Sequence, residues 1–67
     1  MNAERWVVTG TDKYGEIFTY PNQDRADVAP TKEEADDTVI RMNRRGGNVK
    51  AHKEVWSGPK AAYVKVD

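Results

Sequence analysis

Residues 31–47 read TKEEADDTVIRMNRRGG and decide the fold, because they carry the one clear helical pattern in the chain. The hydroxyl of Thr31 can accept the amide of Glu34 while the Glu34 carboxylate reaches back to the Thr31 amide, which is the capping box of a helix start. Gly46 supplies a left-handed residue of the kind that ends a helix. We therefore predict one helix between these signals, with a packing stripe formed by Ala35, Thr38, Val39 and Met42.

Two runs rich in β-branched and aromatic residues precede this helix. They span residues 5–9 and 16–20 and are separated by a turn-forming cluster, which predicts a hairpin. We expect the first strand to stop at Gly10. Residues 21–30 are polar, have Pro at both ends and show no period, so they are interpreted as a connecting loop.

Two alternating runs follow the helix, at residues 49–56 and 61–66, and they flank a turn at residues 57–60. They predict a second hairpin. The order ββαββ predicts the α+β fold class, as a four-stranded antiparallel sheet with one helix packed on one face. The order of the strands within that sheet does not follow from the sequence.

The length and composition predict one small domain over residues 1–67, with neither a disulfide framework nor a thiolate metal site, because the chain has no Cys. A core of this size supplies only about 3–5 kcal/mol of stability, which favours self-association. The first five residues hold Glu4 and Arg5 where a secretory signal needs an apolar segment, and no apolar run approaches the length of a membrane span. We therefore expect a cytoplasmic protein without a membrane partner.

The eleven basic and eleven acidic side chains are unevenly distributed along the chain. Residues 1–37 hold nine acidic and four basic side chains, whereas residues 38–67 hold seven basic and two acidic ones. Part of this asymmetry matches the helix dipole, since the helix carries its acids in the first half and its Arg residues in the second. The remainder, on the last hairpin, can serve an anionic partner or contact between copies.

Alternation along the strands sorts their side chains into two faces. One helix covers one face only, so we expect Val7, Ile17, Trp56 and Tyr63 to form an exposed apolar patch on the other. Trp and Tyr are enriched at protein interfaces, which predicts a non-enzymatic protein-binding or regulatory module that forms homodimers through this open face. His52 lies on the same face, and Ile40 on the helix flank adds a further contact. The side chains expected beneath the helix are Trp6, Val8, Phe18, Tyr20, Val49, Ala51, Val55, Ala62, Val64 and Val66.

A nucleic-acid-binding function is the alternative for the same face. Aromatic side chains on an open sheet with a basic rim are the components of a platform for single-stranded nucleic acid, and the rim here consists of Arg5, Lys50, Lys53 and Lys65. The zero net charge and the lack of an RNA-binding motif count against this reading.

The sequence contains few of the residues that catalytic and metal-binding sites require. His52 is the only His and Ser57 the only Ser, so the chain has almost no residues that could form a pair of catalytic nucleophile and base. We therefore predict no enzyme, cofactor or small-molecule substrate. Asp24 and Asp27 lack the spacing of a calcium loop, so no metal site is predicted.

The order of motifs resembles a group of small proteins. WVVTG at residues 6–10, a Gly-containing hairpin, PTKEEAD at residues 30–36, the paired Gly residues and the closing hairpin are similar to small ββαββ proteins of actinobacteria and their bacteriophages. Such proteins are mostly of unknown function. For a chain of phage origin, the resemblance implies binding of a host protein.

Overall fold

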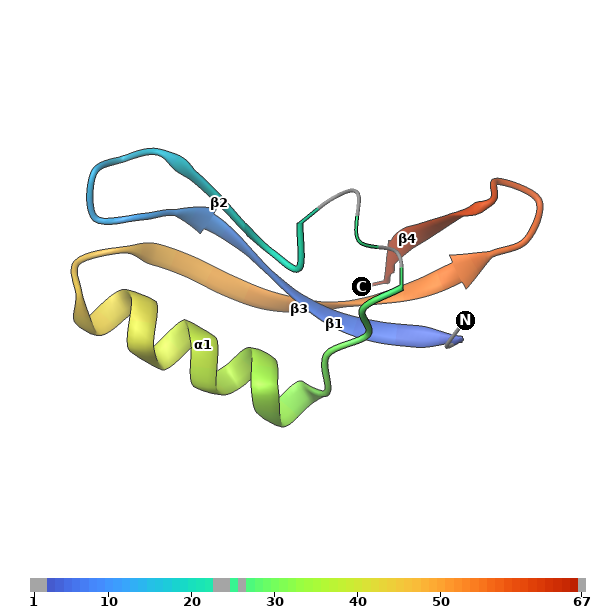
Figure 1. Ribbon diagram of the computed structural model, residues 1–67, viewed down its shortest axis with the longest axis horizontal. Coiled ribbons are helices and arrows are strands. Elements are labelled where there is room, and N and C mark those ends of the chain that lie inside the picture. Colours follow the sequence, from blue (N-terminus) through green and yellow to red (C-terminus); the bar gives the residue numbers. More distant parts are fainter. Residues whose placement is uncertain (1–2, 23–24, 26, 67) are drawn as a thin grey trace.

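The computed structural model describes residues 3–22, 25 and 27–66 and shows one sheet with one helix (Figure 1). The strands are antiparallel and lie in the order β2-β1-β3-β4, so the two hairpins meet along β1 and β3. The described residues form an elongated body of 37 × 22 × 21 Å. The elements are β1 (Glu4–Thr11), β2 (Ile17–Tyr20), α1 (Lys32–Arg44), β3 (Asn48–Ser57) and β4 (Ala62–Val66).

The predicted α+β fold class with its ββαββ order is confirmed. The helix begins as predicted: the Glu34 amide donates to Thr31 Oγ1 at 3.2 Å, and the Thr31 amide donates to Glu34 Oε1 at 3.4 Å. Gly46 ends the helix region with φ 97. Asn43 then fastens the helix end to the sheet, because its side chain accepts from the Val49 amide at 2.9 Å and donates to the Val49 carbonyl at 3.2 Å.

The prediction that the first strand stops at Gly10 is wrong, since β1 continues to Thr11. Gly10 lies inside the strand with φ 150. A Cβ at this position would overlap the Asn48 carbonyl oxygen and lie 2.7 Å from Val49 Cα. Glycine therefore lets β1 approach β3 closely at this point, which keeps the ladder intact instead of ending it.

The core lies where α1 crosses β1 and β3. Val8, Ala35 and Val49 are fully or almost fully buried there, and the stripe predicted on the helix faces them. Thr38 is 9% exposed and satisfies its hydroxyl by donating to the Glu34 carbonyl at 3.0 Å. The partly buried side chains around this centre are Trp6, Phe18, Tyr20, Val39, Met42 and Ala51.

The expectation that the helix also covers the last hairpin is wrong. Val55 and Val64 are only half-buried, Ala62 is exposed and Val66 is 40% exposed. The reason is length: thirteen helical residues span about 20 Å, whereas ten strand residues of β3 span about 33 Å. We call residues 53–66, the part of β3 that pairs with β4 together with β4 itself, the arm; in Figure 1 it projects beyond the helix.

Candidate functional site: the arm and the open face of the sheet

Strand register places the predicted face opposite the helix. Trp56 pairs with Tyr63, and His52 lies directly opposite Val7. Directly paired residues of antiparallel strands share a face, so these four side chains lie on the side of the sheet away from the core. Ile17 joins them through its pairing with Thr11.

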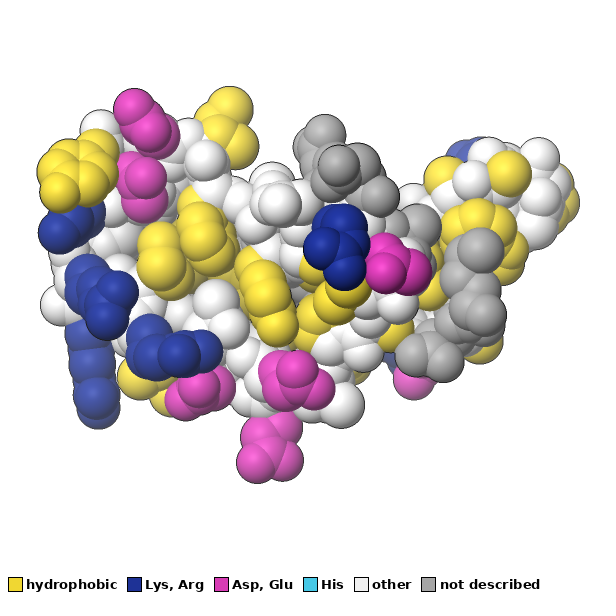
Figure 2. Space-filling view, viewed as in Figure 1, with side chains coloured by type: hydrophobic (Ala, Val, Ile, Leu, Met, Phe, Trp, Pro, Cys, Tyr) yellow, Lys and Arg dark blue, Asp and Glu magenta, His cyan; other side chains and the backbone are white. Residues whose placement is uncertain are grey.

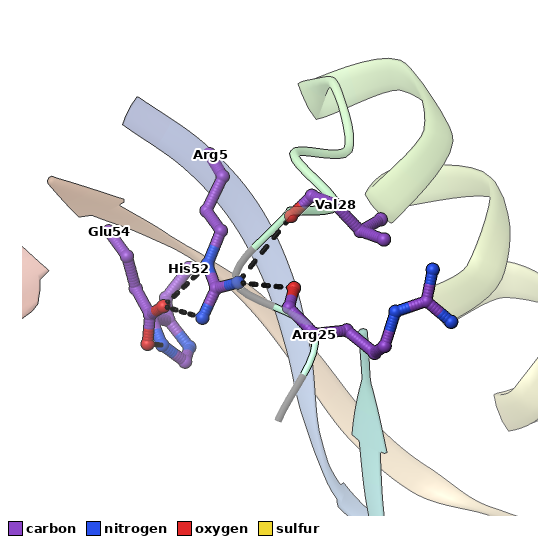
Figure 3. Close-up of polar contacts among 5 residues, drawn as sticks. All are labelled: Arg5, Arg25, Val28, His52 and Glu54. Carbon is purple, nitrogen blue, oxygen red and sulfur yellow. Dashed lines mark hydrogen bonds and ion pairs between the residues drawn. The ribbon is translucent and has the colours of Figure 1, made fainter. Parts of the chain in front are cut away.

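Val7 is not exposed, contrary to the prediction, because only 4% of it is accessible. Arg5 lies on the same face, and its guanidinium donates to the carbonyls of Arg25 at 3.3 Å and Val28 at 3.4 Å (Figure 3). These bonds hold part of the 21–30 loop over the face that the helix leaves open. The loop had been expected only to connect two elements. It also contributes two carbonyl oxygens to the contacts on this face, where His52 lies directly opposite Val7 in register.

Arg5 organises a polar cluster next to Val7. Its Nε donates to Glu54 Oε1 at 3.0 Å and its NH2 group lies 3.0 Å from the same oxygen. Glu54 Oε2 lies 3.3 Å from His52 Nε2 (Figure 3). The Arg5 side chain is only 9% exposed, and those of Glu54 and His52 are 19% exposed. The guanidinium thus forms a half-buried ion pair and hydrogen bonds to backbone carbonyls, so Arg5 contributes to the fold.

Two aromatic rings extend this cluster onto the arm. The ring centroids of Trp56 and Tyr63 are 5.3 Å apart at 75°, an edge-to-face arrangement that aromatic pairs favour. Arg5 Cζ lies 4.1 Å from the centre of the Tyr63 ring, within cation–π distance. Both rings remain half-buried. This arrangement makes the open face of the arm a preformed surface of aromatic rings above a buried cation.

The predicted contact residues do not form one patch. Ile17 is 87% exposed but lies at the far end of the sheet, since its partner Thr11 pairs with Asn48. Asn48 and Trp56 are separated by about 27 Å of strand. Ile40 is 51% exposed and lies on the helix, beside a shallow hollow bordered by acidic side chains. The prediction of one contiguous patch is therefore wrong: Trp56 lies beside Tyr63 and His52 lies opposite Val7, whereas Ile17 and Ile40 lie apart from both pairs.

The basic rim predicted for nucleic acid is also dispersed. Arg5 is paired with Glu54, as described above. Lys53 lies on the helix side, opposite Trp6 and Val66 in register, and its Nζ is 2.9 Å from a Glu4 carboxylate oxygen. Lys50 and Lys65 remain on the open face, in different stretches of it.

In the described part of the chain, no group of three or more His, Cys, Asp or Glu side chains is placed to hold a metal ion. Asp27 accepts from Arg25 at 3.1 and 3.3 Å, and this bond lowers the pKa of its carboxyl below the ordinary value. Asp24, considered with it in the sequence, lies outside the described residues.

Among the described residues, α1 is neither long nor apolar enough to cross a membrane. Comparison of the chain with protein-family models, with curated proteins and with solved structures gives no match.

Sequence reasoning missed the exposure of the arm on the helix side. Val55, Val64 and Val66 alternate like core residues, so the pattern alone assigns them to the covered face. The relative lengths of helix and strand could have indicated this exposure, because a helix of thirteen residues reaches only part of a ten-residue strand.

Proposed function

We propose that this chain is a non-enzymatic protein-binding module that self-associates through the arm. One observation carries the proposal: β4 is an edge strand of the sheet, and its helix-side residues Ala62 and Val66 are exposed. β1 also pairs with β3 along the arm, from Trp6–Lys53 to Glu4–Val55, so β4 is the outermost of three strands there and a further strand can add only at its outer edge. An unpaired edge is also a template for pairing with another chain.

A second copy fits this edge because β4 is self-complementary. If two β4 strands pair antiparallel about Val64, each Val64 lies opposite its counterpart, and Ala62 lies opposite the Val66 of the other copy. All of these side chains lie on the helix side of the arm. On the open face, Tyr63 then lies opposite the Lys65 of the other copy, a favourable cation–π arrangement. The two sheets become one continuous sheet with a closed two-fold interface.

The nucleic-acid alternative has weaker support. Two of its four cations, Arg5 and Lys53, are already in ion pairs within the chain, with Glu54 and Glu4. A host protein, which the phage-type resemblance implies, would use the same arm, with Trp56 and Tyr63 as anchors.

Sedimentation velocity over a concentration series tests the proposal. We expect the wild-type chain to form dimers with a dissociation constant at or below about 100 μM. Val64→Lys should weaken this association at least tenfold, because the two new charges face each other across the pairing axis. The matched control is Ile17→Lys, which places the same side chain on the other edge strand and should leave dimerisation unchanged.

Two results would overturn this function. One is a wild-type chain that stays monomeric throughout the series. The other is dissociation by Ile17→Lys with dimers retained in Val64→Lys, which moves the interface to the opposite edge. Far-UV circular dichroism of each variant checks that the fold is kept.

A further inference from the structure

A groove runs between β2 and the C-terminal half of α1, at the end of the molecule away from the arm. It exists because α1 packs mainly on β3 and β1, which leaves the helix side of β2 partly open. The groove consists of two adjoining hollows of about 240 and 200 Å³ that share Met42 and Arg45. Figure 2 shows a band of hydrophobic side chains across this face, with Lys and Arg side chains gathered at one end of it. The remaining lining residues are Tyr20, Thr38 and Arg41 in the first hollow and Asp12, Lys13 and Tyr14 in the second.

The rim of this groove is positively charged. Lys13 comes from the turn between β1 and β2, and its Cβ lies 3.6 Å from the point where a Cβ on Gly46 would be, so it stands beside the helix C-terminus. In the described residues, neither Lys13 nor Arg45 has an ion-pair partner. Arg41 forms an exposed ion pair with Asp37, in which its NH2 group lies 3.2 Å from Oδ2. The groove therefore offers three cations around an apolar floor.

The one acid in the lining does not neutralise this charge directly. Asp12 Oδ1 accepts from the Tyr14 amide at 2.8 Å and from the Glu16 amide at 3.0 Å. The carboxylate is thus engaged by the turn that carries Lys13. Lys13 Nζ in turn lies 5.0 Å from the centre of the Tyr14 ring, and this ring is 76% exposed.

We infer that this groove binds a short, extended, acidic segment of a partner protein. Carboxylates of the segment would pair with Lys13, Arg41 and Arg45, and an apolar side chain between them would lie on Met42. The combination of an apolar floor with a cationic rim selects a ligand that has both features. A purely acidic peptide would contact only the cationic rim, and a purely apolar peptide only the apolar floor.

The surroundings favour a peptide over a nucleic acid. The first half of the same helix carries Glu33, Asp36 and Asp37 on its exposed side. An extended polyanion leaving the groove along the helix would meet these carboxylates within the range of unscreened charge, about 8–10 Å. Nucleic-acid sites also neutralise more phosphates than three cations can, typically about 6–10. A short segment with a few carboxylates engages the cations of the groove without extending along the acidic half of the helix.

Fluorescence anisotropy tests the inference with a defined probe, the fluorescein-labelled peptide Gly-Asp-Glu-Leu-Asp-Phe-Glu-Gly. Comparison probes are the same peptide with Asn and Gln in place of its acids, the same peptide with Ser in place of Leu and Phe, and a short labelled oligothymidine. We expect the acidic-apolar peptide to bind at least tenfold more tightly than each of the three others at physiological ionic strength.

Variants assign the binding to the groove. The double variant Lys13→Gln with Arg45→Gln should lower the affinity for the peptide about tenfold or more. Its matched control is Arg44→Gln with Lys60→Gln, which removes the same charge from exposed positions outside both hollows and should change the affinity by less than about twofold. Val64→Lys should bind the peptide as the wild type does, so this result is independent of self-association.

Several outcomes would overturn the inference. The inference is wrong if the peptide does not bind, or if the two double variants lose the same amount of peptide affinity. Tighter binding of oligothymidine than of the peptide assigns the groove to nucleic acid. If the groove variant lowers self-association and leaves peptide binding unchanged, the groove is a contact between copies.

Discussion

Two ends of the same sheet have the same kind of sequence and very different environments. At the covered end, Val8 and Val49 are 0% and 2% exposed beneath α1. On the arm, Val66 lies on the same face of the sheet and is 40% exposed. Alternation and residue type do not distinguish these valines. The reach of the helix does, which shows that a face assigned by pattern becomes a core only where a second layer lies over it.

The open face repeats this contrast with a different cover. Val7 is 4% exposed, on the part of the face where Arg5 bonds the loop carbonyls of Arg25 and Val28. Ile17 on the same face is 87% exposed. Burial on this face therefore depends on local contacts, and the exposed residues of the arm lie beyond the reach of α1.

The largest expected effect comes from the glycines. Gly10→Ala at the covered end should cost about 3 kcal/mol or more, because a Cβ there meets β3 backbone and φ is positive. Gly58→Ala in the arm turn is the matched control, with nothing within 4 Å of its Cβ, and should be nearly neutral. Urea unfolding monitored by Trp fluorescence measures both. A well-folded Gly10→Ala variant of wild-type stability would contradict the close approach of β1 and β3.

A pair of identical substitutions measures the contrast in cover. Val8→Ala should destabilise the chain by about 2–3 kcal/mol, from lost burial and the cavity left behind. Val66→Ala should cost less than about 0.5 kcal/mol in the monomer, because that side chain is 40% exposed. Both values come from urea unfolding at a protein concentration below that of dimer formation. Equal costs at the two positions would show that the arm is packed in solution as well as the core is.

A smaller effect is expected where the arm is fastened to the rest of the sheet. Arg5→Met should cost about 1–2 kcal/mol, because it removes a half-buried ion pair with Glu54 and two bonds to loop carbonyls. Lys53→Met removes an exposed ion pair with Glu4 instead and should cost less than about 0.5 kcal/mol. Thermal unfolding gives the order of the two, and near-UV circular dichroism follows the Trp56 and Tyr63 environment. A reversed order would mean that Arg5 does not hold the loop on the sheet.

Much of the fold followed from local sequence signals. The capping box at Thr31 and Glu34 and the glycine at position 46 are short-range patterns, and the helix between them has the expected stripe. Gly10 was misread because a glycine in a strand can end the strand or allow close contact with a neighbour. Which of the two applies depends on β3, whose approach at Asn48 is a long-range fact.

The candidate site was predicted less completely for the same reason. Trp56 and Tyr63 were assigned to one face from alternation, and the register brings them together. Arg5 was assigned to a basic rim, yet it is buried against Glu54, which is 49 residues away. Two cations of the groove, Lys13 and Arg45, also come from separate segments, so their proximity has no signal in the sequence.

The sequence by itself determined the elements, their order and the face to which most side chains point, because caps, turns and alternation act over a few residues. Tertiary structure alone decided which parts of each face are covered. The strand order, the reach of α1 along β3 and the bonds from Arg5 to the 21–30 loop all depend on contacts between distant segments. Coverage is a property of two layers together, and for this reason the arm and the groove became visible only in the folded chain.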